Sequence, residues 1–192
     1  MSIEAAFVRS AASASDLPRD GLAQIALVGR SNVGKSSLIN ALVRRRIART
    51  SAAPGKTRLA NVYRVRRGSA EARYLVDLPG YGFARGNAGE FEAIADAVFG
   101  ARGVSRAAAL LLVDARHPGL ENDREAWRWL TATIVNRAVI ATKIDKLSRA
   151  ERLRAIRACE AVFDHPVAAV SADTGEGLDE LWTLIDRLAN NR

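Results

Sequence analysis

The sequence predicts an α/β protein with a mainly parallel six-stranded sheet, one antiparallel strand and helices on both faces. Three observations support this prediction. Short apolar segments alternate with segments of helical spacing, most apolar segments lack a polar face, and one pair of segments is joined by a short turn. Strands that are apolar on both faces are typical of parallel sheets, because crossover helices cover them. A three-layer arrangement follows from this pattern.

The expected strands are short segments bounded by turn residues. Gln24–Val28 is apolar up to Gly29, and Ala107–Val113 is apolar throughout. Leu59–Val65 alternates as a half-exposed strand does, and Ala72–Val76 follows after a turn, which predicts a hairpin and therefore one antiparallel strand. Two more strands are expected at Ala138–Thr142 and Val167–Val170.

The expected helices repeat apolar residues every three or four positions. Ser148–Phe163 begins with Ser148 and has Glu151 three residues later, which is the pattern of a capping box. The other helices are expected at Ser36–Arg45, Glu90–Phe99, Glu121–Leu130 and Gly177–Leu188. Thr50–Thr57 and Asp77–Gly89 are expected to be loops because they contain glycine, with serine and proline in the first.

Length and composition limit the class of protein. A chain of 192 residues suits one domain, and we expect a partly flexible segment over 1–20 followed by a single domain over 21–192. The single cysteine, Cys159, excludes a disulfide framework and fits a reducing compartment. No apolar run approaches the length of a membrane span, and no secretory signal is visible, so a cytoplasmic protein without membrane contact is expected.

The positive charge is concentrated in one part of the chain. The net charge is +8, yet ten cations and one anion lie between Ala41 and Leu75. A basic segment of this kind favours a polyanionic partner, most naturally nucleic acid. The alternative interpretation is that an arginine-rich and alanine-rich chain reflects genome composition.

The strongest motif is Gly29–Ser36, with the sequence GRSNVGKS, which matches GxxxxGK[ST] between an expected strand and an expected helix. The glycines allow successive backbone N–H groups to point at a phosphate. Lys35 adds a positive charge for the β- and γ-phosphate oxygens, and the Ser36 hydroxyl is a ligand suited to Mg²⁺. The motif therefore predicts a site for a nucleoside triphosphate with magnesium.

Two further segments fit the same site. Asp77–Gly80, with the sequence DLPG, follows a strand, where the Asp77 carboxylate could hold Mg²⁺ through a water. Gly80 could donate its N–H to the γ-phosphate and let the following loop move when that phosphate leaves. Thr57 lies in a loop between these motifs, and its hydroxyl could complete the magnesium ligands when the γ-phosphate is present.

A third group of residues points to guanine. Asp145, in the segment TKID, could accept hydrogen bonds from N1–H and N2–H₂ of guanine, and adenine has no such pair of donors. Lys143 would lie over the base plane, and the backbone of Ser171–Ala172 could donate to guanine O6. ATP as the substrate is therefore disfavoured.

Taken in order, these motifs resemble a small GTPase of the translation-factor class. The longer segments GRSNVGKSSLINAL, SAAPGKTR, DLPGYGFA, VDARH and TKIDKLS closely resemble the EngB/YihA-type ribosome-biogenesis GTP-binding proteins, over about Gln24 to Leu184. The resemblance implies a P-loop GTPase fold, GTP, GDP and Mg²⁺ as ligands, and a role in assembly of the large ribosomal subunit. A requirement in cell division and septation is also expected, and the protein is expected to be a monomer.

The resemblance assigns the site residue by residue. Ser36, Thr57 and Asp77 are the expected magnesium ligands. The expected nucleotide-binding residues are Gly29, Arg30, Ser31, Asn32, Val33, Gly34, Lys35, Ser36, Ser37, Gly55, Lys56, Thr57, Asp77, Leu78, Pro79, Gly80, Thr142, Lys143, Asp145, Ser171 and Ala172. The base motif opens with Thr142 where most GTPases have asparagine, which puts one hydrogen bond of the base loop in doubt.

The expected catalytic residues are Lys35, Thr57, Gly80 and Asn32. Many GTPases place a glutamine directly after DxxG, but Tyr81 stands here, so slow hydrolysis by the isolated protein is expected. In the resembling potassium-activated GTPases an asparagine at the position of Asn32 binds K⁺. A role in stabilising the loop is the alternative.

Other interpretations remain at this point. The chain could be a GTPase that serves another RNA-linked process, or a non-enzymatic RNA-binding module with a vestigial nucleotide site. The intact Lys35, Ser36, Thr57 and Asp77 argue against the second. Three further charged residues match the family pattern, and ion pairing is the expected role of Asp114, Arg116 and Asp123.

Overall fold

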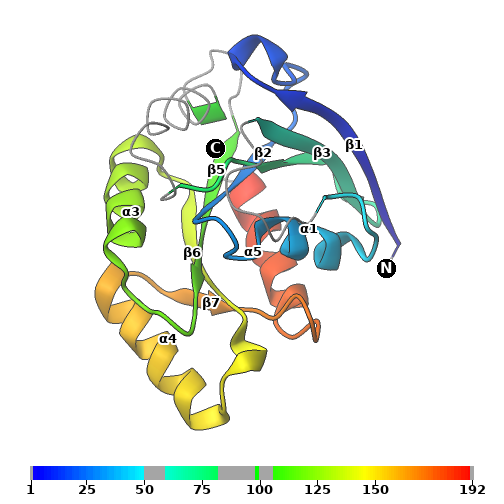
Figure 1. Ribbon diagram of the computed structural model, residues 1–192. Helices are drawn as coiled ribbons and strands as arrows, with labels where there is room; N and C mark the ends of the chain where they lie inside the picture. The colour runs from blue at the N-terminus through cyan, green and yellow to red at the C-terminus, as the bar shows by residue number, and fades with distance from the viewer. Residues whose placement is uncertain (1, 50–58, 82–97, 100–105, 191–192) are drawn as a thin grey trace.

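The computed structural model describes residues 2–49, 59–81, 98–99 and 106–190 as a seven-stranded sheet between two layers of helices (Figure 1). The strands are β1 (Ile3–Ala11), β2 (Gln24–Gly29), β3 (Ala60–Arg67), β4 (Arg73–Asp77), β5 (Ala107–Asp114), β6 (Arg137–Thr142) and β7 (Val167–Ala169). The helices are α1 (Lys35–Val43), α3 (Glu121–Thr133), α4 (Arg149–Phe163) and α5 (Leu178–Asn190), with short 3₁₀ turns at Ala14–Asp16 and Ile144–Lys146.

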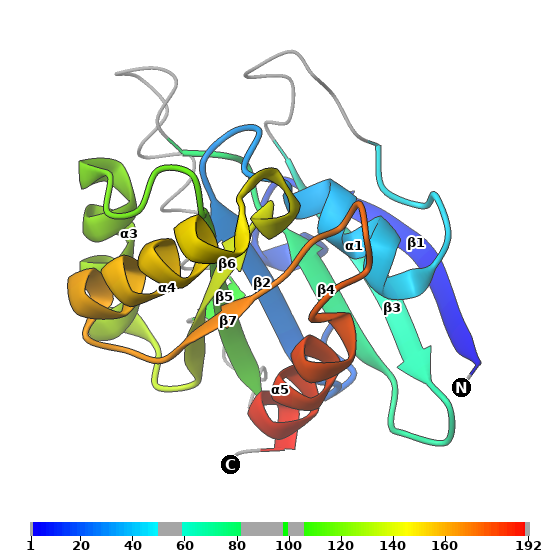
Figure 2. The ribbon, with the colours of Figure 1, turned by 90° about the horizontal axis from the view of Figure 1, so that it is seen from below.

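The strand order is β1-β3-β4-β2-β5-β6-β7, and Figure 2 shows β1 and β3 at one edge of the sheet. β2, β4, β5, β6 and β7 pair in parallel, and β3 pairs antiparallel with both β4 and β1. β3 is therefore the single antiparallel strand that the hairpin predicts. The α/β class and the three layers are confirmed.

The number of strands is seven and not the predicted six, because β1 adds to the edge of the hairpin. Most residues of β1 are exposed, so main-chain hydrogen bonds to β3 form this strand with little help from apolar burial. A strand of this kind gives a weak hydrophobic pattern, which is why the sequence did not predict it.

Apolar side chains fill both spaces between sheet and helices. α1 and α5 cover one face of the sheet, and α3 and α4 cover the other (Figure 1). Every residue of β2 and β4 is buried, as is nearly all of β5. This burial on both faces explains why residues 25–28 and 107–113 are unbroken apolar sequences, whereas β4 has charged residues at both of its ends. None of the helices in the described residues has the length and apolar character needed to cross a membrane.

The loops that follow the parallel strands lie together at the edge of the sheet that is formed by the carboxyl ends of these strands. β2 ends at Gly29, β4 at Asp77, β5 at Asp114 and β6 at Thr142, and each of these strands pairs in parallel with a neighbour. In parallel sheets ligands bind at the carboxyl ends of the strands. The motifs that are far apart in the sequence therefore meet at this edge.

The predicted capping box at the start of α4 is present and can be tested. Glu151 N donates to Ser148 Oγ at 3.4 Å, and Ser148 N donates to Glu151 Oε2 at 2.8 Å, which forms the predicted capping box. We expect Ser148→Ala to lower the free energy of unfolding by about 1 kcal/mol in urea denaturation, because one orphan N–H at the helix start loses its acceptor. Ser69→Ala, at an exposed serine in the turn between β3 and β4, is the control. Equal losses in both variants would contradict the capping role.

Candidate functional site

The loop between β2 and α1 has the backbone shape of a phosphate loop. Two residues have left-handed backbone angles, Asn32 with φ 63° and Gly34 with φ 110°. Residues with a side chain rarely adopt the second conformation, so glycine is needed at the N-cap of α1. The first N–H groups of a helix have no partner within that helix, and their partial positive charge favours an anion.

The side chain of Lys35 lies inside this loop. Its Nζ donates to the carbonyl oxygens of Gly29 at 2.8 Å and Arg30 at 3.2 Å. Burial lowers the pKa of Lys35, and the nearby Asp77 carboxylate opposes that shift. A buried ammonium group gains most from a further anionic partner, so its position suits a phosphate oxygen.

Ser36 and Asp77 meet at the end of β4. Ser36 Oγ donates to Asp77 Oδ2 at 2.6 Å, and the Asp77 side chain is buried. Burial raises the pKa of Asp77, while Lys35 and the Ser36 hydroxyl oppose the shift. A hydroxyl and a carboxylate in contact are hard oxygen ligands, and Mg²⁺ is usually bound by one or two such groups together with phosphate oxygens. The residues present therefore fit the predicted metal.

Gly80 lies against the phosphate loop. A methyl group added at its Cα would lie 2.6 Å from both the backbone nitrogen and the Oγ of Ser31. Directly after it, Tyr81 forms a parallel bridge with Arg30. The segment that follows β4 is therefore packed on the phosphate loop. This packing is needed if Gly80 and the phosphate loop are to contact the same phosphate group, as the sequence predicts.

Asp145 and Ser171 form the centre of the predicted base site. Ser171 Oγ donates to Asp145 Oδ1 at 2.6 Å, and Lys146 Nζ lies 2.8 Å from Asp145 Oδ2. The hydrogen bond from Lys146 and then that from Ser171 lower the pKa of Asp145, which keeps the group a carboxylate. An ionised carboxylate accepts and does not donate, which suits the paired donors of guanine.

Lys143 and Thr142 connect the base loop to the phosphate loop. Lys143 Nζ donates to the carbonyl oxygen of Asn32 at 2.6 Å and to Asp114 Oδ2 at 3.0 Å. The Thr142 hydroxyl lies 2.8 Å from the carbonyl oxygen of Val33 and 3.1 Å from that of Val113. The threonine that departs from the common pattern therefore still holds the phosphate loop, through its hydroxyl.

Asp114 has a larger role than the ion pairing the sequence predicts. It accepts from Arg116 Nη2 at 2.7 Å and also from Lys143. Burial raises the pKa of Asp114, but the hydrogen bonds from Arg116 and Lys143 outweigh burial and hold that pKa below its usual range. Asp114 thus positions Lys143, and its place at the end of β5 is the signal that could have suggested this.

A second network was not predicted. The buried carboxylate of Asp123 on α3 accepts from Tyr81 Oη at 2.8 Å and from Arg30 Nε at 3.2 Å. Burial raises the pKa of Asp123, and hydrogen bonds from Tyr81 and charge from Arg30 oppose the shift. The network links the phosphate loop, the start of the segment after Gly80 and α3. The expected ion pairing of Asp123 is present, with Arg30 as its partner.

The structure describes most of the predicted site residues. Leu78 and Pro79 are buried beside Asp77, while Ser37 and Ala172 are half-buried next to Ser36 and Ser171. Gly55, Lys56 and Thr57 lie outside the described residues, so the third predicted magnesium ligand remains a prediction.

The fold and this site define a P-loop GTPase that binds GTP and GDP. Residues 24–143 match the family described as "50S ribosome-binding GTPase". The chain is 43% identical over 199 aligned positions to a protein of Heliobacterium modesticaldum named "Probable GTP-binding protein EngB", covering 97% of this chain and 93% of the relative. A Solibacter usitatus protein of the same name is 42% identical over 190 positions, covering 96% and 95%. The chain belongs to the EngB family of GTP-binding proteins.

Solved structures agree with this fold. A crystal structure of a probable GTP-binding protein EngB superposes with a TM-score of 0.63 at 23% identity, covering 88% of this chain and 100% of that one. Era in complex with MgGDPNP and a segment of 16S ribosomal RNA superposes with a TM-score of 0.73 at 25% identity. That match covers 90% of this chain but only 58% of the Era chain.

The contact between Gly80 and Ser31 leads to a prediction. We expect Gly80→Ala to lower the affinity for GDP at least about tenfold, or ~1.4 kcal/mol, because the new methyl group pushes the phosphate loop out of place. Isothermal titration calorimetry measures the affinity, and the melting temperature without nucleotide checks the fold. Adding Ser31→Ala should not restore binding, since the backbone nitrogen of Ser31 still obstructs the methyl group. Wild-type affinity in Gly80→Ala would contradict the interpretation.

Proposed function

We propose that this GTPase is a molecular switch that assists assembly of the large ribosomal subunit and binds a precursor particle in its GTP form. The observation that carries the proposal is the intact site, in which Lys35, Ser36, Asp77 and Asp145 converge at one edge of the sheet in a chain whose family is described as 50S ribosome-binding. A function in the cytoplasm, as a monomer, and a requirement in normal cell division complete the proposal.

Each residue of the site has a defined task in this proposal. The N–H groups at the start of α1 and the Lys35 ammonium bind the phosphates. Ser36 and Asp77, with Thr57 as the expected third ligand, would hold Mg²⁺, which supplies positive charge against the phosphate oxygens when bound. Asp145 selects guanine by accepting its two donors, and Lys143 fixes the base loop against the phosphate loop.

Hydrolysis by the isolated protein should be slow. Tyr81 occupies the position of the usual water-orienting glutamine, and its hydroxyl donates to Asp123. Because the Tyr81 hydroxyl donates to this buried carboxylate, it is not available to orient the attacking water. The proposal is that binding to the ribosomal precursor, or a monovalent cation, supplies the missing stabilisation.

The charge distribution supports a ribosomal RNA partner. Ten cations and one anion lie between Ala41 and Leu75, and this segment includes Thr57. Era, which has the same fold, is seen with a segment of 16S ribosomal RNA, so the small subunit is the alternative target within this class. A GTPase that serves another RNA-linked process would share the site but not the particle.

Base selection by Asp145 can be tested directly. We expect Asp145→Asn to lower the affinity for GDP at least about a hundredfold, because the amide N–H of asparagine would face the donors of guanine. Each polar group left without a hydrogen-bond partner costs ~1–3 kcal/mol of binding free energy. Affinity for xanthosine diphosphate, which has a carbonyl in place of the guanine amino group, should rise. Asp173→Asn is the control, because Lys146 Nζ forms ion pairs with both Asp145 and Asp173, the second at 3.0 Å from Asp173 Oδ2. Unchanged preference for GDP over ADP in Asp145→Asn would refute this role.

Asn32 can be tested through cation dependence. The side chain of Asn32 is exposed at the phosphate loop, and its oxygen is a suitable ligand for K⁺. We expect GTP turnover to be faster in KCl than in NaCl at equal ionic strength, and Asn32→Ala to remove that difference. If Asn32 only stabilises the loop, Asn32→Ala will lower turnover equally in both salts, and equal wild-type rates will exclude the K⁺ role.

The proposed partner is tested by co-sedimentation. We expect the protein with a non-hydrolysable GTP analogue to sediment with large-subunit precursor particles, and the protein with GDP to remain mostly in the supernatant. The salt dependence of sedimentation should be steep, since phosphate contacts release counterions. Small-subunit particles are the matched control. Equal binding of both nucleotide forms, without salt dependence, would overturn the proposal.

A further inference from the structure

A short turn after α1 carries an unusual density of positive charge. Arg44, Arg45, Arg46 and Arg49 are all exposed, and none has an ion-pair partner among the residues that the structure describes. Some other arginines in the described part of the chain are paired, for example Arg66 with Glu4 and Arg106 with Glu71, whereas those at 149, 154 and 157 on α4 are not. The charge of this turn is therefore not neutralised within the described part of the protein.

The backbone of this arginine turn is held in one shape. Asn40 Oδ1 accepts from the N–H groups of Ile47 and Ala48 at 2.9 and 2.8 Å, and Asn40 Nδ2 donates to the carbonyl oxygen of Ala48 at 2.8 Å. Ala48 is buried, and Ile47 packs against the core beside α1. An ordered turn loses less entropy on binding than a flexible arginine tail, so it is a suitable platform for phosphate groups.

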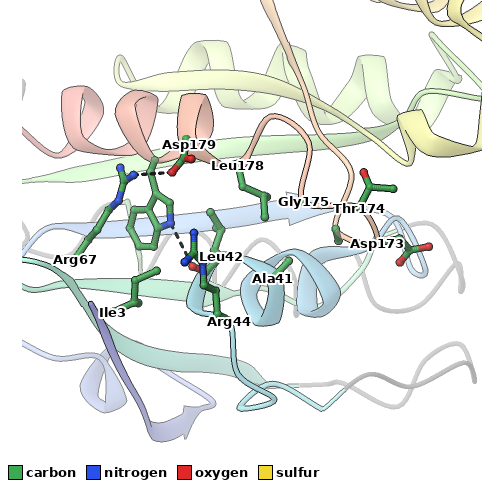
Figure 3. Close-up of a pocket in the computed structure, with 12 residues that line it drawn as sticks. Ile3, Ala41, Leu42, Arg44, Arg67, Asp173, Thr174, Gly175, Leu178 and Asp179 are labelled. Atoms are coloured by element: carbon green, nitrogen blue, oxygen red, sulfur yellow. Dashed lines mark hydrogen bonds and ion pairs between the residues drawn. The ribbon is translucent and has the colours of Figure 1, made fainter. Parts of the chain in front are cut away.

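A pocket of about 550 Å³ lies next to this turn, and Arg44 is one of its lining residues (Figure 3). Its volume falls in the range of about 300–1,000 Å³ typical of small-ligand sites. One wall is apolar, with Leu42 from α1 and Leu178 from α5, and another is the segment that follows Ser171, with Thr174. The pocket therefore combines an apolar interior with polar groups and a cation at its margin.

The planar guanidinium group of Arg67, which lines the pocket, is held by two contacts. The Arg67 guanidinium lies 5.7 Å from the centre of the Trp182 ring and forms an ion pair with Asp179 at 2.7 Å, which Figure 3 marks with a dashed line. Asp173, the other acidic residue of the lining, pairs with Lys146. Both acidic groups are thus neutralised, and Arg44 is the charged residue of the lining for which the described part of the chain supplies no ion-pair partner.

From this juxtaposition we infer that the arginine turn and the pocket together bind a single-stranded segment of RNA. The inference rests on the proposed function and names the surface that contacts RNA. The four arginines contact successive phosphates, and one unpaired base enters the pocket beside the guanidinium of Arg67. Proteins recognise single-stranded RNA by combining backbone charges with pockets for splayed bases, which often stack on arginine planes. A duplex could use the arginines but could not place a base in the pocket.

The test measures binding of short fluorescein-labelled RNA to the full chain loaded with a non-hydrolysable GTP analogue, by fluorescence anisotropy at several salt concentrations. We expect R44A/R45A/R46A to weaken single-strand binding at least about tenfold. The slope of log K against log salt should fall by about 2, because each phosphate that the variant no longer neutralises removes ~0.7 from it. The matched control is R149A/R154A/R157A, which removes three exposed arginines from α4. Equal effects of the two triple variants would mean that only net charge matters and would overturn the inference.

The pocket is tested with Ala41→Phe, which places a larger side chain at its lining. We expect this variant to weaken binding of single-stranded RNA while binding of a duplex of the same sequence stays unchanged. Its GDP affinity and melting temperature establish that the fold and the nucleotide site are intact. Equal affinity of wild type and Ala41→Phe for the single strand would exclude a base in the pocket.

The two proposals can fail separately. If the wild-type protein sediments with the large-subunit precursor in its GTP form, and R44A/R45A/R46A sediments equally well, the inference about this surface is wrong while the proposed function stands. If the wild-type protein sediments with no ribosomal particle but the single-stranded RNA still distinguishes the two triple variants, the surface stands and the proposed function is wrong.

Discussion

The shape of the phosphate loop depends on hydrogen bonds that reach it from another strand. Lys143 and Thr142, at the end of β6, bind the carbonyl oxygens of Asn32 and Val33, while Lys35 binds that of Gly29. With its carbonyl groups occupied in this way, the loop presents N–H groups at the start of α1. The residues of the predicted base site and those of the phosphate loop therefore form one connected unit.

This arrangement buries three charged side chains, which lose their hydration. Lys35, Asp77 and Asp123 are all buried. Burial lowers the pKa of Lys35 and raises the pKa of both aspartates, so it favours the neutral form of each group. Each group has a partner that offsets part of the desolvation, such as Ser36 for Asp77 and Arg30 for Asp123. Such groups reduce stability when a partner is removed, so they persist where they meet a ligand or fix a loop.

Sequence reasoning predicted the features that leave a pattern in the chain. The doubly buried strands β2 and β5 have continuous apolar sequences, β4 was predicted from the hairpin turn before it, and the phosphate loop, Asp77 and Asp145 followed from motif spacing. β1 was missed because it is held by main-chain hydrogen bonds and carries little apolar burial. Ion pairing of Asp123 was predicted but its partner Arg30 was not, because the two residues lie 93 positions apart and an acidic residue in the first turn of a helix is common.

The place of β1 in the sheet has a consequence for synthesis of the chain. It leaves the ribosome before the other described strands, yet its partner β3 begins roughly 50 residues later, since Ala11 pairs with Ala60. At about 5–20 residues per second, β1 waits several seconds for that partner. Phe7 and Val8 are exposed even in the folded protein, and the nearby charges of Glu4 and Arg9 limit association of the unpaired strand with other nascent chains.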